Sequence, residues 1–147
     1  MDKMTSTSNK GNEAWKKLML QSEKLYLRCP SSMYQHIERI LEGSKYDLLN
    51  FGNHSSLVEL INESPNTNRP KRIIYHFSNL FYDSGIIETR EIIKELNTLI
   101  PHVKIIGLYR NNHGVEELLK SNGVTHALEY SINPNSKFET ELQKLLF

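Results

Sequence analysis

The sequence holds a single cysteine, Cys29, and its surroundings suit nucleophilic chemistry. Arg28 precedes the cysteine, and the segment CPSSMYQ that begins with it reads as a turn followed by a helix start. A neighbouring cation and a helix N-terminus both favour the thiolate, which is the nucleophile in cysteine-dependent phosphotransfer and phosphatase reactions. We nevertheless expect Cys29 to be a buried structural residue, with the enzymatic interpretation kept as an alternative.

Other residue types that perform chemistry show no organised pattern. The six histidines lack HxH or HExxH spacing, and one cysteine allows neither a disulfide nor a cysteine-rich metal site. His76 lies in a predicted buried strand, so we expect it to be hydrogen-bonded in the core. No GxGxxG or GxxxxGK[ST] motif occurs. The sequence therefore predicts no catalytic residue, no metal and no cofactor.

The charge balance limits the classes of partner. Lys and Arg number 18 against 17 Asp and Glu, a formal net charge of +1, which argues against nucleic-acid or membrane binding by charge alone. The one local positive run, Arg69, Lys71 and Arg72, reads as a solvated loop and strand entry, although contact with a phosphate or an acidic partner stays open. No apolar run approaches the roughly 20 residues of a membrane helix, so we expect a cytoplasmic protein.

Strands alternate with helices along most of the chain. The predicted strands are 24–28, 46–51, 72–77, 103–109 and 124–130, and the predicted helices are 32–41, 55–62, 86–99, 114–122 and a last one through 138–146. Residues 63–70 and 78–85 are predicted loops. Short connections between such units require parallel strands and right-handed crossovers. We therefore predict an α/β, flavodoxin-like three-layer sandwich with a five-stranded parallel sheet of order 2-1-3-4-5, and a ligand would bind at the carboxyl ends of the strands.

Residues 1–22 are predicted to form a separate N-terminal extension. Residues 1–12 are polar and read as a flexible tail, and Trp15, Leu18 and Met19 follow at the spacing of a short amphipathic helix. Residues 23–147 form the predicted domain.

This domain resembles the receiver domain of two-component response regulators over about five-sixths of the chain. The resemblance rests on Gly52-Asn53 leading into SSLVELI, on Asp83-Ser84-Gly85, on IIGLY and on GVTHALEY. It implies a signalling protein whose sheet edge binds a divalent metal and carries a phosphorylated aspartate.

The positions that carry receiver chemistry are all changed. The acidic pair falls at Arg28 and Cys29, and the phosphoaccepting aspartate falls among His76, Phe77 and Ser78. Tyr109 replaces the Ser or Thr that ends the fourth strand, and Tyr130, followed by Ser131, replaces the Lys and Pro after the fifth. Phosphoryl transfer needs the acceptor, the metal and a cation at the leaving charge. We therefore expect a degenerate receiver, or pseudo-receiver, whose regulatory role is independent of phosphorylation.

The resemblance implies that the domain acts through protein contacts. In the receiver family these contacts commonly use one face, which in this chain corresponds to the predicted helix 114–122, the predicted strand 124–130 and the C-terminal helix. The expected interface residues are Arg110, Val115, Leu118, Leu119, Tyr130 and Phe138. Tyr130 and Arg110 are preferred, because such side chains bury a large area while keeping a polar end available, whereas most of the leucines are expected in the core. We expect a protein partner or a homodimer, and a chain that is either a stand-alone domain or part of a longer protein.

Two alternatives remain. The Cys29 turn is similar to those of sugar-phosphotransferase B components and low-molecular-weight tyrosine phosphatases, but Gln35 stands where the phosphatase loop has Arg, and the segment has no glycine. The other alternative is a flavodoxin-like module that binds a small ligand between Arg28, Ser78, Tyr109 and Tyr130.

Overall fold

The computed structural model of the chain describes residues 22–78, 80, 82–110 and 114–147. Five parallel strands form one sheet in the order β2-β1-β3-β4-β5, which confirms the predicted topology. The strands are β1 (Glu23–Arg28), β2 (Tyr46–Asn50), β3 (Arg72–His76), β4 (Lys104–Tyr109) and β5 (His126–Glu129). Isoleucines pair at the centre, where Ile73 and Ile74 of β3 face Ile105 and Ile106 of β4. Such β-branched residues favour a sheet that is covered on both faces.

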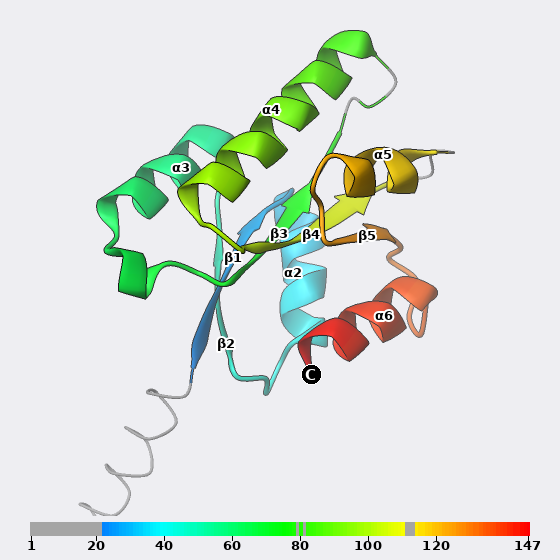
Figure 1. The fold of residues 1–147 in the computed structure, drawn as a ribbon. Coiled ribbons are helices and arrows are strands. Elements are labelled where there is room, and N and C mark those ends of the chain that lie inside the picture. Colours follow the sequence, from blue (N-terminus) through cyan, green and yellow to red (C-terminus); the bar gives the residue numbers. More distant parts are fainter. Residues whose placement is uncertain (1–21, 79, 81, 111–113) are drawn as a thin grey trace, which may run out of the picture.

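Helices cover both faces of the sheet and complete the three layers (Figure 1). They are α2 (Ser31–Ile40), α3 (His54–Glu63), α4 (Asp83–Leu99), α5 (Val115–Ser121) and α6 (Lys137–Leu146), with a 3₁₀ turn, η1 (Asn66–Asn68), before β3. The side chains of Asn53 and Ser136 accept hydrogen bonds from backbone N–H groups in the first turns of α3 and α6. These caps satisfy amide groups that a helix leaves without a partner.

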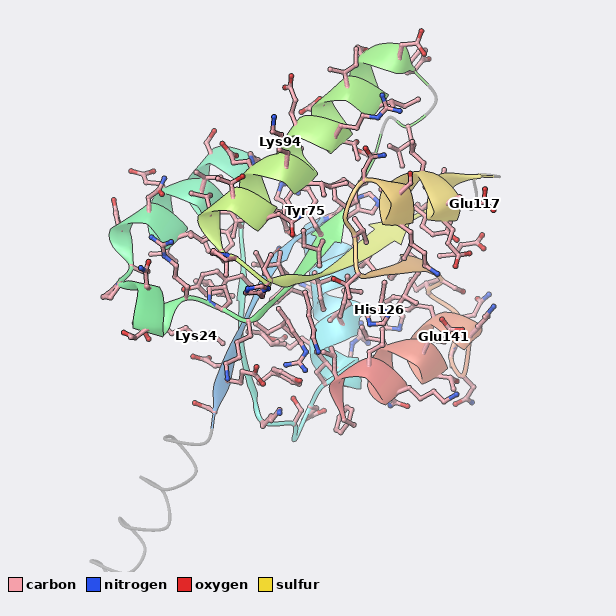
Figure 2. The ribbon with its side chains drawn as sticks, in the orientation of Figure 1. Lys24, Tyr75, Lys94, Glu117, His126 and Glu141 are labelled. Atoms are coloured by element: carbon pink, nitrogen blue, oxygen red, sulfur yellow. The ribbon has the colours of Figure 1, made fainter. Side chains whose placement is uncertain are left out.

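Each face of the sheet has its own hydrophobic core. One lies beneath α3, α4 and α5 and includes Leu57, Ile93 and Leu119, and the other lies beneath α2 and α6 and includes Ile37 and Leu142. Figure 2 shows side chains filling both layers, whereas Lys94 and Glu117 lie on the outer surface. The sheet is therefore fixed on both sides, and the ends of its strands are left to form a site.

Some predicted boundaries need correction. Helix α4 begins at Asp83 rather than Ile86, because a carboxylate in the first turn is favoured by the helix dipole and Gly85 is buried inside the helix rather than in a loop. The predicted 63–70 loop contains η1, and β5 begins at His126 because the Val124 N–H donates to the Leu119 carbonyl in the preceding turn. The remaining differences are one or two residues, within the usual uncertainty of element ends.

The predicted N-terminal extension lies, apart from Ser22, outside the described residues. Among the helices that the structure describes, none combines the length and the apolar composition needed to cross a membrane.

Candidate functional site

The carboxyl ends of the parallel strands bring the predicted pocket residues to one edge of the sheet. Arg28 ends β1 opposite Tyr75, and His76 ends β3 opposite Leu108. The predicted residues differ, however, in exposure: Cys29, Phe77 and Tyr109 are buried, Arg28, His76 and Tyr130 are partly exposed, and Ser78 is exposed. All three buried side chains pack in the hydrophobic cores, and Tyr109 also forms part of the wall of a groove beside β5. The pocket prediction therefore needs correction for Cys29 and Phe77, whose side chains serve in packing.

Cys29 is a buried residue of the β1–α2 turn, as expected for a structural cysteine. Its side chain is 2% exposed, its backbone N–H donates to Asn50 Oδ1 at 3.1 Å, and Asn50 Nδ2 donates back to the Cys29 carbonyl at 3.1 Å. Burial raises the pKa of the Cys29 thiol to about 12, and the lowering effect of Arg28 does not offset it. The expectation that this turn favours a thiolate is therefore wrong, because desolvation outweighs the neighbouring charge.

Asn50 is the residue of this turn that sequence reasoning missed. It ends β2, and its amide makes both bonds to the Cys29 backbone from 21 positions away. An asparagine that closes a strand is a weak signal by itself, since its partner becomes evident only once β1 and β2 are paired.

Positive groups gather around the end of β3. Burial lowers the pKa of His76, and Arg110 and Arg28, in that order, lower it further. Within the described part of the chain neither arginine has a carboxylate partner, and His76 has no side-chain hydrogen bond. The prediction of a hydrogen-bonded core histidine is therefore wrong: His76 is half-buried at the strand end, and in the described residues it faces cations rather than an acceptor.

Tyr130, directly after β5, is held in place by a network that reaches helices α2 and α6. Its hydroxyl is 3.0 Å from His36 Nδ1 on α2, and His36 Nε2 is 3.4 Å from a Glu139 carboxylate oxygen on α6. The Arg110 guanidinium lies 5.5 Å from the centre of the Tyr130 ring, a cation–π distance. Sequence reasoning missed His36, although its place beside Ile37 on the buried face of α2 was a signal.

A second histidine network lies on the opposite face. The Tyr75 hydroxyl is 2.9 Å from His54 Nδ1, and His54 Nε2 is 2.5 Å from a Glu95 oxygen. This chain of groups resembles a proton relay, but Tyr75 is 4% exposed and burial raises the pKa of its hydroxyl to about 12. The contacts therefore fasten α3 and α4 to β3 and do not activate a nucleophile.

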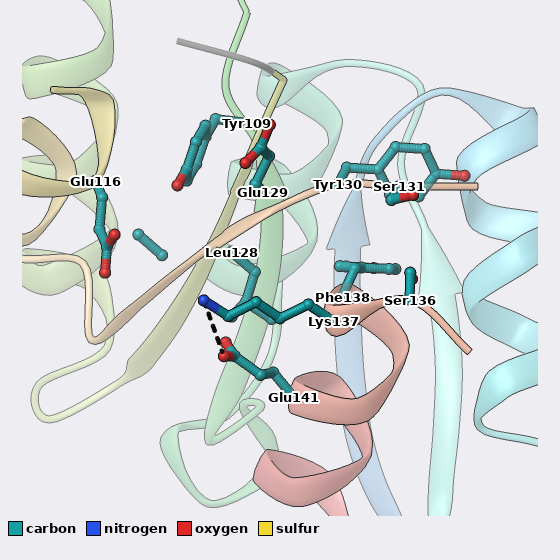
Figure 3. Close-up of a pocket in the computed structure, with 11 residues that line it drawn as sticks. Tyr109, Glu116, Leu128, Glu129, Tyr130, Ser131, Ser136, Lys137, Phe138 and Glu141 are labelled. Atoms are coloured by element: carbon teal, nitrogen blue, oxygen red, sulfur yellow. Dashed lines mark ion pairs between the residues drawn. The ribbon is translucent and has the colours of Figure 1, made fainter. Parts of the chain in front are cut away.

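A groove of about 680 Å³ lies along β5 between α5 and α6, on the face predicted to contact partners. Figure 3 shows carboxylates from three elements around it, Glu116 of α5, Glu129 of β5 and Glu141 of α6, the last paired with Lys137. Burial raises the pKa of the Tyr109 hydroxyl in the groove wall, and these three glutamates raise it further. The groove is thus predominantly acidic.

The predicted interface residues on this face divide by exposure. Val115, Leu119 and Phe138 are at most 5% exposed, so they support the face from within and offer no contact area. Arg110 is exposed, and Leu118 and Tyr130 are partly exposed. The interface prediction must therefore be restricted to these three residues, because the other side chains are used in packing α5 and α6 on the sheet.

Comparisons with known proteins identify the fold. No family model matches the sequence, and no match was found among the curated proteins. Among solved structures, the receiver domain of the sensor histidine kinase PA1611 from Pseudomonas aeruginosa is similar with a TM-score of 0.59 at 18% identity, covering 85% of this chain and 94% of that domain. The chemotaxis protein CheY4 of Vibrio cholerae has a TM-score of 0.61 at 14% identity, covering 86% and 99%. A response regulator from Thermotoga maritima has a TM-score of 0.65 at 8% identity, covering 85% and 98%. The chain therefore has the fold of response-regulator receiver domains.

The PA1611 domain holds a magnesium ion in its active-site cleft, which sets a test for the corresponding edge of this chain. Magnesium requires oxygen ligands, above all carboxylates. Among the described residues there is no group of three or more His, Cys, Asp or Glu side chains that could hold a metal. Arg28 and Arg110 place positive charge beside the strand ends instead. The described residues at the strand ends therefore do not fit a divalent cation.

Proposed function

We propose that this chain is a receiver-like regulatory domain that works through protein contacts and without phosphorylation of an aspartate. The observation that carries the proposal is the chemistry of the carboxyl edge: at and just beyond the ends of β1, β3 and β4 lie Arg28, His76, Ser78 and Arg110 in place of carboxylates, and Glu129 at the end of β5 lies in the acidic groove. Without an acceptor carboxylate and a bound cation, the charge that develops on a transferred phosphoryl group has no stabilisation.

The buried thiol supports a non-enzymatic role. Cys29 is the one nucleophile that the sequence offered for an alternative phosphotransfer or phosphatase reaction. Its burial and its pKa of about 12 remove both access and thiolate character at neutral pH. We therefore do not assign a reaction to this residue.

The face formed by α5, β5 and α6 is the proposed contact surface. It combines the partly exposed Leu118 and Tyr130 with the groove that carries Glu116, Glu129 and Glu141. Tyrosine at the centre of a surface is a common source of binding energy, and like charges on the two sides of an interface are costly. The partner surface that fits is therefore basic, with an apolar group that reaches Leu118.

Incubation with acetyl phosphate and magnesium, followed by intact-mass measurement, tests the loss of phosphorylation. A phosphorylatable receiver treated in parallel is the positive control. The expected result is an unchanged mass for this chain under conditions in which the control gains a phosphoryl group. A stable phospho-adduct on this chain would refute the proposal.

Light scattering coupled to size exclusion tests the contact surface with a second copy of the chain as the partner. A mass near twice 17.1 kDa that returns to the monomer in the Arg110→Glu and Tyr130→Ala variants would support a homodimer in which Arg110 of one copy supplies the positive charge that suits the acidic groove of the other. A monomer at all concentrations would exclude a homodimer through this face.

A further inference from the structure

The ends of β1 and β3 form the topological switch point of the sheet. The chain passes from β1 through α2 to β2 on one side, and from β3 through α4 to β4 on the other (Figure 1). In open parallel sheets the crossovers diverge at this point, and ligands bind in the crevice outside the carboxyl ends of the two strands. Arg28 and His76 are the last residues of these two strands. A ligand at the usual place in this fold would therefore meet them first.

The charged groups at this point are cationic and are not neutralised within the described residues. Arg28 and Arg110 form no ion pair there, and His76 makes no side-chain hydrogen bond. Both arginines lie near enough to His76 to lower its pKa. Arg110 is exposed and Arg28 is partly exposed, and neither forms an ion pair with a carboxylate of the described residues, so both guanidinium groups are available to a bound anion.

Neutral donors lie at the same edge. Helix α2 starts three residues after Arg28, has no side-chain cap at Pro30 and carries no acidic residue in its first turn. Its first amide groups and the positive end of its dipole therefore add to the field of the arginines. The hydroxyl of Ser78, exposed two residues beyond β3, is a further donor.

We propose that the cationic edge, defined as Arg28, His76, Ser78 and Arg110, binds a phosphate group without forming a covalent bond. Guanidinium groups donate two parallel hydrogen bonds to phosphate oxygens, and a tetrahedral dianion accepts donors from several directions, here from the ends of β1, β3 and β4. The phosphate group belongs either to inorganic phosphate or to a phosphate monoester.

A titration followed by two-dimensional NMR tests this site. The probes are sodium phosphate, glycerol phosphate and sodium acetate, each added against sodium chloride at constant ionic strength. The expected result is a saturable shift of the backbone signals of His76, Ser78 and Arg110 with at least one phosphate probe and none with acetate. Which phosphate probe binds more tightly then identifies the source of the group.

Variants locate the binding. Arg28→Gln and Arg110→Gln should each raise the dissociation constant at least tenfold, and Arg28→Lys, which keeps the charge but loses the paired donors, should raise it less. Arg90→Gln is the matched control, because Arg90 is exposed on α4 and its replacement removes the same charge away from this edge. The melting temperature of each variant in chloride shows that a loss of binding is not a loss of folding.

Three results would overturn the proposal: shifts that never saturate, an equal loss in Arg90→Gln, or binding of acetate as tightly as phosphate. The last result would assign the edge to carboxylates, such as an acidic side chain of a protein partner. The test is independent of the proposed lack of phosphorylation, because the anion here binds reversibly, whereas failure of that proposal would appear as a covalent gain in mass.

Discussion

Alkylation of Cys29 offers a quantitative test of the buried thiol. The pKa of the thiol rises from 9.0 to about 12. At pH 8 the thiolate fraction therefore falls from roughly one in ten to roughly one in ten thousand, a decrease of about a thousandfold. The side chain is also only 2% exposed, so iodoacetamide has to wait for local opening. Native protein should react at least about a thousandfold more slowly than protein unfolded in guanidinium chloride.

Intact-mass measurement at timed intervals gives the alkylation rate. A Cys29→Ala variant that also carries Ser55→Cys provides an exposed thiol on the same scaffold, since Ser55 lies exposed in the first turn of α3. This control should react at nearly the same rate in the native and unfolded states. The rate of Cys29 should keep rising above pH 9, where an ordinary thiol levels off. Native alkylation within tenfold of the unfolded rate would show that the thiol is accessible and ionised, and it would restore Cys29 as a candidate nucleophile.

Three further predictions concern stability, measured by urea unfolding. Tyr130→Phe should lower the free energy of unfolding by about 1 kcal/mol, because it removes the hydrogen bond to His36, whose side chain is nearly buried. In a double-mutant cycle with His36→Phe the two losses should be non-additive, and additive losses would contradict the network. Gly107→Ala should lower the free energy of unfolding by about 1–3 kcal/mol, because the new methyl group would lie 3.0 Å from Val124 Cγ1 and 3.2 Å from Phe77 Cε2. Gly52→Ala is the control and should cost less, because no atom lies within 4 Å of the added methyl group. The pKa of His76 in the folded state lies below its value of 6.5 in the unfolded chain, so the unfolded state takes up the proton first as the pH drops. The free energy of unfolding should therefore fall as the pH drops from about 7 through the folded-state pKa. His76→Gln should make this fall shallower, and an equal slope in the variant would contradict the lowered pKa of His76.

The fold was predictable because local patterns repeat at every level of the chain. Apolar β-branched runs, helix starts such as Asn53 and helix ends such as Gly123 alternate with short connections, and parallel pairing leaves few arrangements for five such units. The start of α4 was less predictable, since Asp83-Ser84-Gly85 has the composition of a loop. Its helical state depends on the burial of Gly85, which a local pattern does not reveal.

The candidate site was predictable in position but not in character. That strand ends meet at one edge follows from parallel topology, and Arg28, His76 and Tyr130 do lie there. The contacts that give these residues their properties join distant positions: His36 and Tyr130 are 94 residues apart, and Cys29 and Asn50 are 21 apart. The depth of burial decides whether desolvation, which raises the pKa of the Cys29 thiol, outweighs Arg28, which lowers it. Burial depends on how the whole chain packs, so the sequence pattern around Cys29 does not reveal it.

The carboxyl edge can reverse its charge without changing the fold, because the residues that carry charge there do not build the cores. Leu27, Tyr75 and Leu108, close before the strand ends, are at most 4% exposed and hold the sheet to its helices. Arg28 and Arg110 lie at or beyond the last ladder bonds and leave both cores untouched. Loss of either guanidinium should therefore alter binding far more than stability. A likeness in fold to a domain that holds magnesium in its active-site cleft consequently carries no information about the sign of a ligand at this edge, which the local side chains determine.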